Sequence, residues 1–287
     1  MTLTLNELGT GFVAEVRGVD FAQAVPPSTI IDITQALDRY GVLVFRDTRL
    51  DDPGHIAFSR QFGELEMAPK LFGTQRARFD HPELFDAGNV DRDGEIMLDE
   101  RRRLYNKGNA LWHTDSSFNP RRAAYSLLLA HRVPPVGGDT EFANMRGAYA
   151  ALPPATQTAI DDLIAEHWLW HSRLLAGYPQ PTAEERQAKP PSRHKLVQYH
   201  PGARAKTLYL AAHASHIVGW PEDQGRELLR ELTQFATQPR FTCAVRWQQS
   251  GDLVIWDNRS TMHRATAFED KRYPRDMRRT TVYDSPG

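Results

Sequence analysis

The residues best suited to chemistry in this chain are two histidines and an aspartate. They lie in Trp112-His113-Thr114-Asp115 and in Met262-His263-Arg264, about 150 residues apart. In an extended strand alternate side chains share a face, so His113 and Asp115 can point at one ion while Thr114 points away. His263 must then come from a distant strand. Two histidines and one carboxylate that leave coordination positions open are typical of non-haem Fe(II) oxygenases.

A His-x-Asp pair alone is weak evidence, because a buried or surface histidine beside a strand-end aspartate has the same spacing. Three neighbouring segments favour the metal site. They are Gly138-Asp139-Thr140-Glu141-Phe142, Trp256-Asp257-Asn258-Arg259 before His263, and Arg275-Asp276-Met277-Arg278-Arg279 after it. The last segment places several guanidinium groups, which bind carboxylates with both oxygens at once, shortly after the last candidate ligand.

The elements that must position these residues are short strands with flanking helices. Apolar patterns predict strands at residues 11–18, 41–45, 124–130, 196–200, 208–212, 241–247, 253–256 and 280–283, and helices at 29–40, 51–62, 155–167 and 222–236. Residues 64–109 and 172–195 lack periodicity and are expected to be long loop insertions. We expect a single domain over residues 1–287, mainly β, as a jelly roll or related barrel.

Composition excludes several functional classes. Hydrophobic residues make up 40% and charged residues 25% of the chain, which predicts a packed globular core. The net charge of −1 gives no sign of nucleic-acid or membrane binding. We expect a cytoplasmic protein, because the start lacks a signal-peptide pattern and no apolar run approaches a membrane span. The single cysteine, Cys243, excludes an internal disulfide and is expected to be a buried apolar residue.

The chain resembles the Fe(II)/α-ketoglutarate-dependent dioxygenases of the taurine dioxygenase superfamily, and within them the aryloxyalkanoate dioxygenases that act on 2,4-dichlorophenoxyacetate. The resemblance rests on the metal and glycine motifs above and on residues 40–46, 56–63, 111–118 and 213–216. His213-Ala214-Ser215-His216 and Trp112-His113-Thr114-Asp115-Ser116-Ser117-Phe118 point to the aryloxyalkanoate branch. The resemblance implies a double-stranded β-helix, or jelly roll.

The resemblance also implies roles for single residues. It makes His113, Asp115 and His263 the iron ligands, with O2 and α-ketoglutarate at the open positions. Thr140 matches a threonine that hydrogen-bonds α-ketoglutarate, and Arg275 an arginine that pairs with its distal carboxylate. Arg279 matches an arginine that holds the acidic end of the primary substrate.

One departure from the family pattern leaves open which basic residue binds the distal carboxylate of α-ketoglutarate. The segment between His263 and the arginines is one residue longer than the family pattern. Arg278, Lys271 or Arg272 could therefore take the place of Arg275. Both Arg275 and Arg279 would share one face of a strand, because they are four residues apart, and this favours Arg275.

Further substrate contacts are expected from loops and from other histidines. Asn89 resembles a position near the substrate in this superfamily, and Lys70 could add a second charge near the substrate acid. An ordinary surface-loop role is the alternative for each. His213 and His216 could contact substrate, or could pack and bind loop carbonyls. Structural roles are expected for His167, His171 and His200.

The expected activity is hydroxylation of a small carboxylic acid, most readily an aryloxyalkanoate. Hydroxylation next to the ether oxygen gives a hemiacetal that collapses to a phenol and a 2-oxoacid, with succinate and CO2 as co-products. A taurine-type sulfonate dioxygenase is the alternative within the superfamily; a cupin-like metal-binding module and a zinc hydrolase are alternatives outside it. The expected partners are the small acid and, as in many members, further copies of the chain in a homo-oligomer.

Overall fold

The computed structural model describes residues 3–68 and 78–284. Lys70, one of the expected substrate contacts, lies outside these residues. None of the helices in the described part has both the length and the apolar character needed to cross a membrane.

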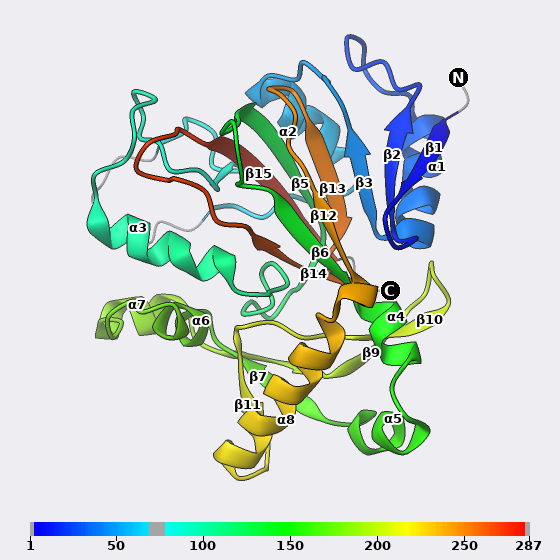
Figure 1. Ribbon diagram of the computed structural model, residues 1–287, viewed down its shortest axis with the longest axis vertical. Helices are drawn as coiled ribbons and strands as arrows, with labels where there is room; N and C mark the ends of the chain where they lie inside the picture. The colour runs from blue at the N-terminus through cyan, green and yellow to red at the C-terminus, as the bar shows by residue number, and fades with distance from the viewer. Residues whose placement is uncertain (1–2, 69–77, 285–287) are drawn as a thin grey trace.

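The largest sheet of the described residues has seven strands (Figure 1). All its neighbouring strands are antiparallel except β2 and β3, which are parallel. In spatial order the strands are β1 (Thr4–Leu8), β2 (Val13–Arg17), β3 (Val42–Phe45), β13 (Leu253–Asp257), β5 (Ala123–Arg132), β15 (Asp276–Tyr283) and β4 (Phe85–Asp86). The central strands β3 and β13 are buried throughout, which explains their continuous apolar sequences.

The two faces of this sheet are covered by different layers. Helices α1 (Pro27–Tyr40) and α2 (Asp52–Arg60) cover one face, where Leu127 and Leu129 of β5 point. Against the other face packs a three-stranded sheet of β12 (Thr242–Val245), β6 (Thr140–Asn144) and β14 (Thr261–Ala265). Ser126 and Leu128 alternate with the helix-facing residues and therefore point toward this second sheet.

Further elements form two small separate sheets, β11-β7-β8 and β10-β9, with helices beside them. They are α4 (Met145–Ala150), α5 (Pro154–Ile160), β7 (Ile164–His167), β8 (Ser192–Lys195), β9 (Val197–His200), β10 (Ala205–Leu208), β11 (Ala214–Ile217), α8 (Glu222–Ala236) and η2 (Pro239–Phe241). The amphipathic α8 buries Leu229 and Leu232 in a core shared with β11 and α4.

A group of short helices lies to one side of the two facing sheets. It comprises α3 (Glu100–Asn106), η1 (Lys107–Ala110), α6 (Leu169–Leu175) and α7 (Ala183–Ala188). In Figure 1, α3 lies over α6 and α7. An ion pair joins α3 to α7: Arg101 Nη2 lies 2.5 Å from Glu185 Oε1.

Several sequence predictions are confirmed. The chain is mainly sheet with flanking helices, and the helices expected at residues 29–40, 51–62 and 222–236 correspond to α1, α2 and α8. The strands expected at 41–45, 124–130 and 253–256 correspond to β3, β5 and β13. These are the segments whose apolar pattern is longest or most continuous.

Other predictions of secondary structure are wrong. The helix expected at 155–167 ends at Ile160, and the chain then forms β7, which pairs with β8 and β11. The strand expected at 208–212 lies earlier, at Ala205–Leu208, because it pairs with β9.

The two expected loops contain regular structure. Asp99 caps α3 by accepting from the backbone N–H groups of Arg101 and Arg102, and Thr182 with Glu185 forms a capping box at α7. Both caps are visible in the sequence, but helices this short have too few residues to show periodicity.

Candidate active site

The two predicted histidine ligands come together through their backbones. His113 and His263 form an isolated antiparallel bridge, with N–O distances of 2.9 Å from His113 to His263 and 2.8 Å in the reverse direction. Residues directly opposite in such a pair place their side chains on the same face. The ring centroids accordingly lie 4.2 Å apart.

Asp115 completes a buried three-residue cluster. Its Oδ1 lies 3.8 Å from His113 Nε2, and its Oδ2 lies 3.6 Å from His263 Nε2. All candidate ligand atoms lie within 4.8 Å of one another, a separation that one metal ion can bridge. His113 Nδ1 lies 2.8 Å from the Leu111 carbonyl oxygen, so Nδ1 carries the proton and Nε2 has its lone pair free.

A chain of hydrogen bonds fixes the Asp115 carboxylate. Ser126 Oγ donates to Asp115 Oδ2 at 2.8 Å, and Asn258 Nδ2 donates to Ser126 Oγ at 2.9 Å. Asn258 Oδ1 accepts from the Asp115 backbone N–H and from Trp256 Nε1. The Trp256-Asp257-Asn258 motif therefore acts by orienting a candidate ligand. Sequence analysis missed Ser126, although a serine within the apolar run of residues 124–130 was a visible signal.

The protonation states of the three residues suit metal binding. Burial lowers the pKa of His113 and lowers that of His263 well below its usual value, so both rings are neutral. Burial would raise the pKa of Asp115, but the charge of Arg279, helped by the hydrogen bond from Ser126, outweighs this effect and lowers it. Two neutral imidazoles and one carboxylate are the forms that bind a divalent ion.

Thr140 lies on the same face of the second sheet as the cluster. His263 of β14 is opposite Phe142 of β6, and Thr140 is two residues from Phe142 on the same strand. The Thr140 hydroxyl is buried and accepts from Trp247 Nε1 at 3.2 Å. Thr140 follows the turn at Gly137 and Gly138, whose φ values of 74° and 71° lie in a region that residues with a Cβ atom rarely adopt.

Arg275 is a buried cation beside this turn. Its guanidinium donates to two carbonyl oxygens, with Nε 3.1 Å from Gly138 O and Nη1 2.8 Å from Ala87 O. Arg275 is only 5% exposed, and it forms no ion pair with a carboxylate of residues 3–68 or 78–284. Burial lowers its pKa to about 10, so it remains charged at neutral pH. A buried charge of this kind favours binding of an anion.

Asn89 holds the Arg275 segment in place. Its Nδ2 donates to the carbonyl oxygens of Asp270 and Tyr273, at 2.7 and 2.9 Å, and its Oδ1 accepts from the Arg275 backbone N–H at 2.6 Å. A direct contact between Asn89 and substrate would have to displace these bonds.

The other basic residues after His263 lie in different places. Arg278 binds Asp52 of α2 and Asp276, on the helix-covered side of the sheet. Arg272 pairs with Glu269 at the surface, and Lys271 is exposed. Among the candidates for an anion beside Thr140, the geometry therefore favours Arg275.

Arg279 contacts the metal cluster directly. Its Nη1 donates to Asp115 Oδ1, and its guanidinium lies over the Phe85 ring, 4.9 Å from the ring centroid. Its Nε is buried and has no hydrogen-bond partner among the described residues. Arg279 is thus placed to bind an acid group immediately beside the metal position.

The two histidines of the 213–216 segment have different surroundings. His213 is buried, its ring packs edge-on against Phe118 with centroids 5.0 Å apart, and its centroid lies 5.9 Å from that of His113. His216 lies on β11, where its Nδ1 is 2.9 Å from Ser215 Oγ. Of these two residues, the structure brings only His213 into contact with the cluster.

A second group of possible ligands, Asp38, His200 and Asp257, is a structural network. Asp257 accepts from His200 Nε2 at 2.8 Å, and Arg259 binds its two oxygens at 2.9 and 2.7 Å. His200 Nδ1 accepts from the Ala203 backbone N–H. The ligand atoms of His200 and Asp257 are thus already engaged by protein partners, which favours a structural role for this group. The expected structural role of His200 agrees with this arrangement.

Comparison with known proteins places this geometry in context. A family model described as "Taurine catabolism dioxygenase TauD, TfdA family" matches residues 4–281. The chain is 42% identical to an α-ketoglutarate-dependent 2,4-dichlorophenoxyacetate dioxygenase of Cupriavidus pinatubonensis, over 99% of each chain. It is 33% identical to an (S)-phenoxypropionate/α-ketoglutarate dioxygenase of Sphingobium herbicidovorans, over 91% of this chain and 88% of the relative. A solved structure of AAD-2 with Mn(II) and N-oxalylglycine superposes with a TM-score of 0.95 at 42% identity, covering 99% of each chain.

Proposed function

The chain belongs to the TauD, TfdA family of dioxygenases, and from this premise we propose that it is an Fe(II)- and α-ketoglutarate-dependent enzyme that oxidises aryloxyalkanoic acids. The fold that supports the site is proposed to be the double-stranded β-helix, or jelly roll. The observation that carries the proposal is the buried cluster of His113, Asp115 and His263 with the buried Arg275 and the half-buried Arg279 beside it.

The three clustered residues are proposed as the iron ligands. Both imidazoles are neutral and present Nε2 toward Asp115, and the carboxylate is oriented by Ser126. When bound, the iron with α-ketoglutarate and O2 supplies the oxidation: α-ketoglutarate becomes succinate and CO2, and one oxygen atom enters a C–H bond of the substrate. The task of the protein is to hold both organic molecules in fixed positions around the iron.

Arg275 and Thr140 are proposed to bind α-ketoglutarate. The buried guanidinium of Arg275, which lacks a carboxylate partner among the described residues, suits the distal carboxylate. The Gly138 carbonyl that accepts from Arg275 Nε precedes Thr140 by two residues, so one ligand can reach both side chains. Asn89 is proposed to position Arg275 in addition to its predicted substrate contact.

Arg279 is proposed to bind the acid group of the primary substrate. Its contact with Asp115 means that an acid held there lies next to the metal ligands. In an aryloxyacetate the carbon to be oxidised is bonded directly to the carboxyl carbon. An acid anchor beside the metal therefore brings the correct carbon to the site of oxidation, and the resulting hemiacetal releases a phenol and glyoxylate.

The relatives favour aryloxyalkanoates over taurine as substrates. Two of them carry phenoxyacetate or phenoxypropionate in their names, at 42% and 33% identity. The remaining expected contacts, from His213, His216 and Lys70, belong to this proposal too, as does a homo-oligomer. Arg275 and Arg279 argue against a simple metal-binding module, because such a module has no need of cations beside its ligands.

The proposal is tested by product analysis with a panel of acids. Purified protein with Fe(II), α-ketoglutarate and O2 is given phenoxyacetate, 2,4-dichlorophenoxyacetate, both enantiomers of 2-phenoxypropionate, or taurine. We expect one phenol and one succinate per aryloxyalkanoate oxidised, and only background succinate with taurine. Succinate release that responds to taurine and to no aryloxyalkanoate would contradict the substrate class.

A further inference from the structure

Arg173 is a second buried arginine with no acidic partner. It lies on α6, its residue is 7% exposed, and no carboxylate of the described residues forms an ion pair with it. Its Nε is buried without a hydrogen-bond partner in the same part of the chain. A buried guanidinium that forms no ion pair favours the binding of an anion.

The surroundings of Arg173 hold its guanidinium flat and in one place. The group lies over the Tyr105 ring, 4.2 Å from the centroid, and Nη2 donates to Asn109 Oδ1 at 3.3 Å. It packs directly on Gly108 of η1, where a Cβ atom would come within 1.7 Å of Nη1. Only a glycine allows this close approach. Tyr105, Gly108 and Asn109 thus form a cradle that holds the Arg173 guanidinium in one position.

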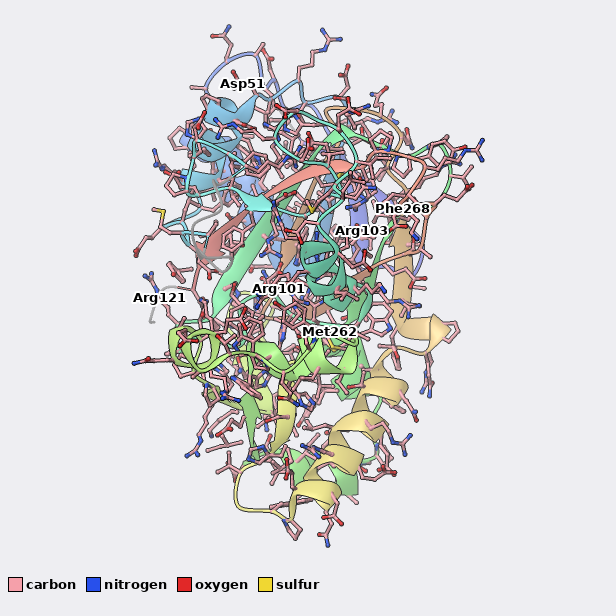
Figure 2. All side chains as sticks on the ribbon, turned by 90° about the vertical axis from the view of Figure 1, so that its left-hand side faces the viewer. Asp51, Arg101, Arg103, Arg121, Met262 and Phe268 are labelled. Carbon is pink, nitrogen blue, oxygen red and sulfur yellow. The ribbon has the colours of Figure 1, made fainter. Side chains whose placement is uncertain are left out.

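This cradle adjoins the candidate active site. The chain runs from Asn109 at the end of η1 to Leu111, whose carbonyl oxygen binds the His113 ring. Trp168, the residue before α6, donates its backbone N–H to the His213 carbonyl oxygen at 2.8 Å, and the His213 ring centroid lies 5.9 Å from that of His113. Figure 2 views the molecule from the side on which these helices lie, with Arg101 and Arg103 of α3 and Met262, the residue before His263, labelled near its centre.

The charges around the cluster can be matched to the charges of the ligands. Arg279 already contacts the Asp115 carboxylate, and the Asp139 charge acts on Arg275, whereas Arg173 forms no ion pair with a carboxylate of the described residues. α-Ketoglutarate brings one carboxylate for the metal and one for Arg275. The remaining anion is the acid group of the primary substrate, and of these three arginines Arg173 is the one without an assigned anion.

We infer that Arg173 is a second anchor for the acid group of the primary substrate, on the α6 side of His113. The inference rests on the proposed function, since it assigns one contact for the substrate class named there. Arg279 and Arg173 then share the recognition of a small organic anion, and Asn109 and Gly108 position the Arg173 guanidinium. The site selects acids over neutral molecules of the same shape, because a neutral molecule leaves the buried charge uncompensated.

The test compares an acid with its neutral isostere in the absence of turnover. Anaerobic protein loaded with Fe(II) and α-ketoglutarate is titrated calorimetrically with phenoxyacetate and with phenoxyacetamide. We expect Arg173→Met to weaken phenoxyacetate binding roughly 10- to 100-fold, and to change phenoxyacetamide binding by no more than about twofold. Arg173→Lys keeps the charge and should recover part of the loss. The exposed Arg193, changed to Met, is the matched control and should change neither titration.

The outcomes distinguish a role of Arg173 in binding the acid from a role in packing alone. Equal losses for the acid and the amide, or no loss for the acid, would overturn the inference. A lowered melting temperature with unchanged discrimination has the same meaning, and if Arg173→Met does not fold, the comparison is made with Arg173→Lys. If the wild type binds no aryloxyalkanoate, the proposed function itself fails and the inference with it. If the wild type binds the acid and Arg173→Met binds it equally well, only the inference fails.

Discussion

His113 and His263 exchange both of their backbone hydrogen bonds although they are 150 residues apart in the chain. This bridge places the two imidazoles side by side, with ring centroids 4.2 Å apart. The relative position of the two rings is therefore fixed by the backbone pairing. Preorganisation of this kind keeps the open side of the site clear for two organic ligands.

Removal of the Ser126 hydroxyl should weaken metal binding. Ser126→Ala deletes the hydrogen bond to Asp115 Oδ2 and leaves Asn258 Nδ2 without its acceptor. Loss of such an orienting contact typically lowers metal affinity about 10- to 100-fold. The dissociation constant for Fe(II) or Mn(II), measured by anaerobic calorimetry, checks this. An unchanged constant would show that Asp115 needs no help from Ser126.

Arg275 and Arg278 should differ in their effect on α-ketoglutarate. Arg275→Met should weaken its binding roughly 10- to 100-fold, because a charge-assisted contact to the distal carboxylate is lost. Arg278→Met breaks ion pairs with Asp52 and Asp276 on the other side of the sheet, and should leave α-ketoglutarate affinity unchanged. The measurement is the rise in melting temperature caused by α-ketoglutarate in the metal-loaded protein. A larger loss in Arg278→Met than in Arg275→Met would reverse the assignment.

The network of Asp257, His200 and Arg259 should act on stability alone. Arg259→Met leaves Asp257 buried without its bidentate partner, and should lower the free energy of unfolding by about 3–5 kcal/mol. His200→Gln should leave one metal bound per chain, whereas His113→Ala should leave none. Urea unfolding and metal analysis of the purified variants provide the two readouts. Loss of metal from His200→Gln would mean that this network holds an ion.

Stability should fall as the pH is lowered from 6.5, in part because His55 and His167 are buried in neutral form. Burial lowers the pKa of His55 and of His167 to about 3, from 6.5 in the unfolded chain. Between these values the unfolded state binds the extra protons, so each residue removes about 1.4 kcal/mol of stability per pH unit. Urea unfolding at pH 6.5 and 5.5 measures the decline. His167→Gln should remove about half of the decline that His55 and His167 cause together. An unchanged decline in this variant would show that His167 is not one of its causes.

The ligand cluster could be found from the sequence because its signals are local. The alternation of His113 and Asp115 in one short segment, and the resemblance in the residues before His263, needed no knowledge of the fold. The spacing favoured Arg275 over Arg278, but it could not show where either guanidinium lies. That depends on tertiary contacts, such as the hydrogen bond by which Asn89 holds the backbone of Arg275 and the ion pair of Arg278 with Asp52.

Other parts of the site depended on tertiary contacts. Ser126 is visible in the sequence as a polar residue within an apolar run, but its role depends on β5 facing the second sheet, where its hydroxyl meets Asp115. Arg173 lay in a stretch expected to be a loop, and its burial depends on Gly108 and Tyr105, which are far from it in the sequence. The strand β7 was assigned to a helix because its apolar residues fit either period over so few positions. Its pairing with β8 and β11 decides the conformation.

The most direct test of the proposed iron site is an anaerobic spectroscopic titration of the metal-loaded protein with α-ketoglutarate. Chelation of Fe(II) by a 2-oxoacid beside two histidines and a carboxylate should give a visible charge-transfer band that saturates at one α-ketoglutarate per chain. His113→Ala should abolish the band, and Arg275→Met should shift its appearance to higher α-ketoglutarate concentrations. A band of full intensity in His113→Ala, or none in the wild type, would contradict the central claim that His113, Asp115 and His263 form the iron site.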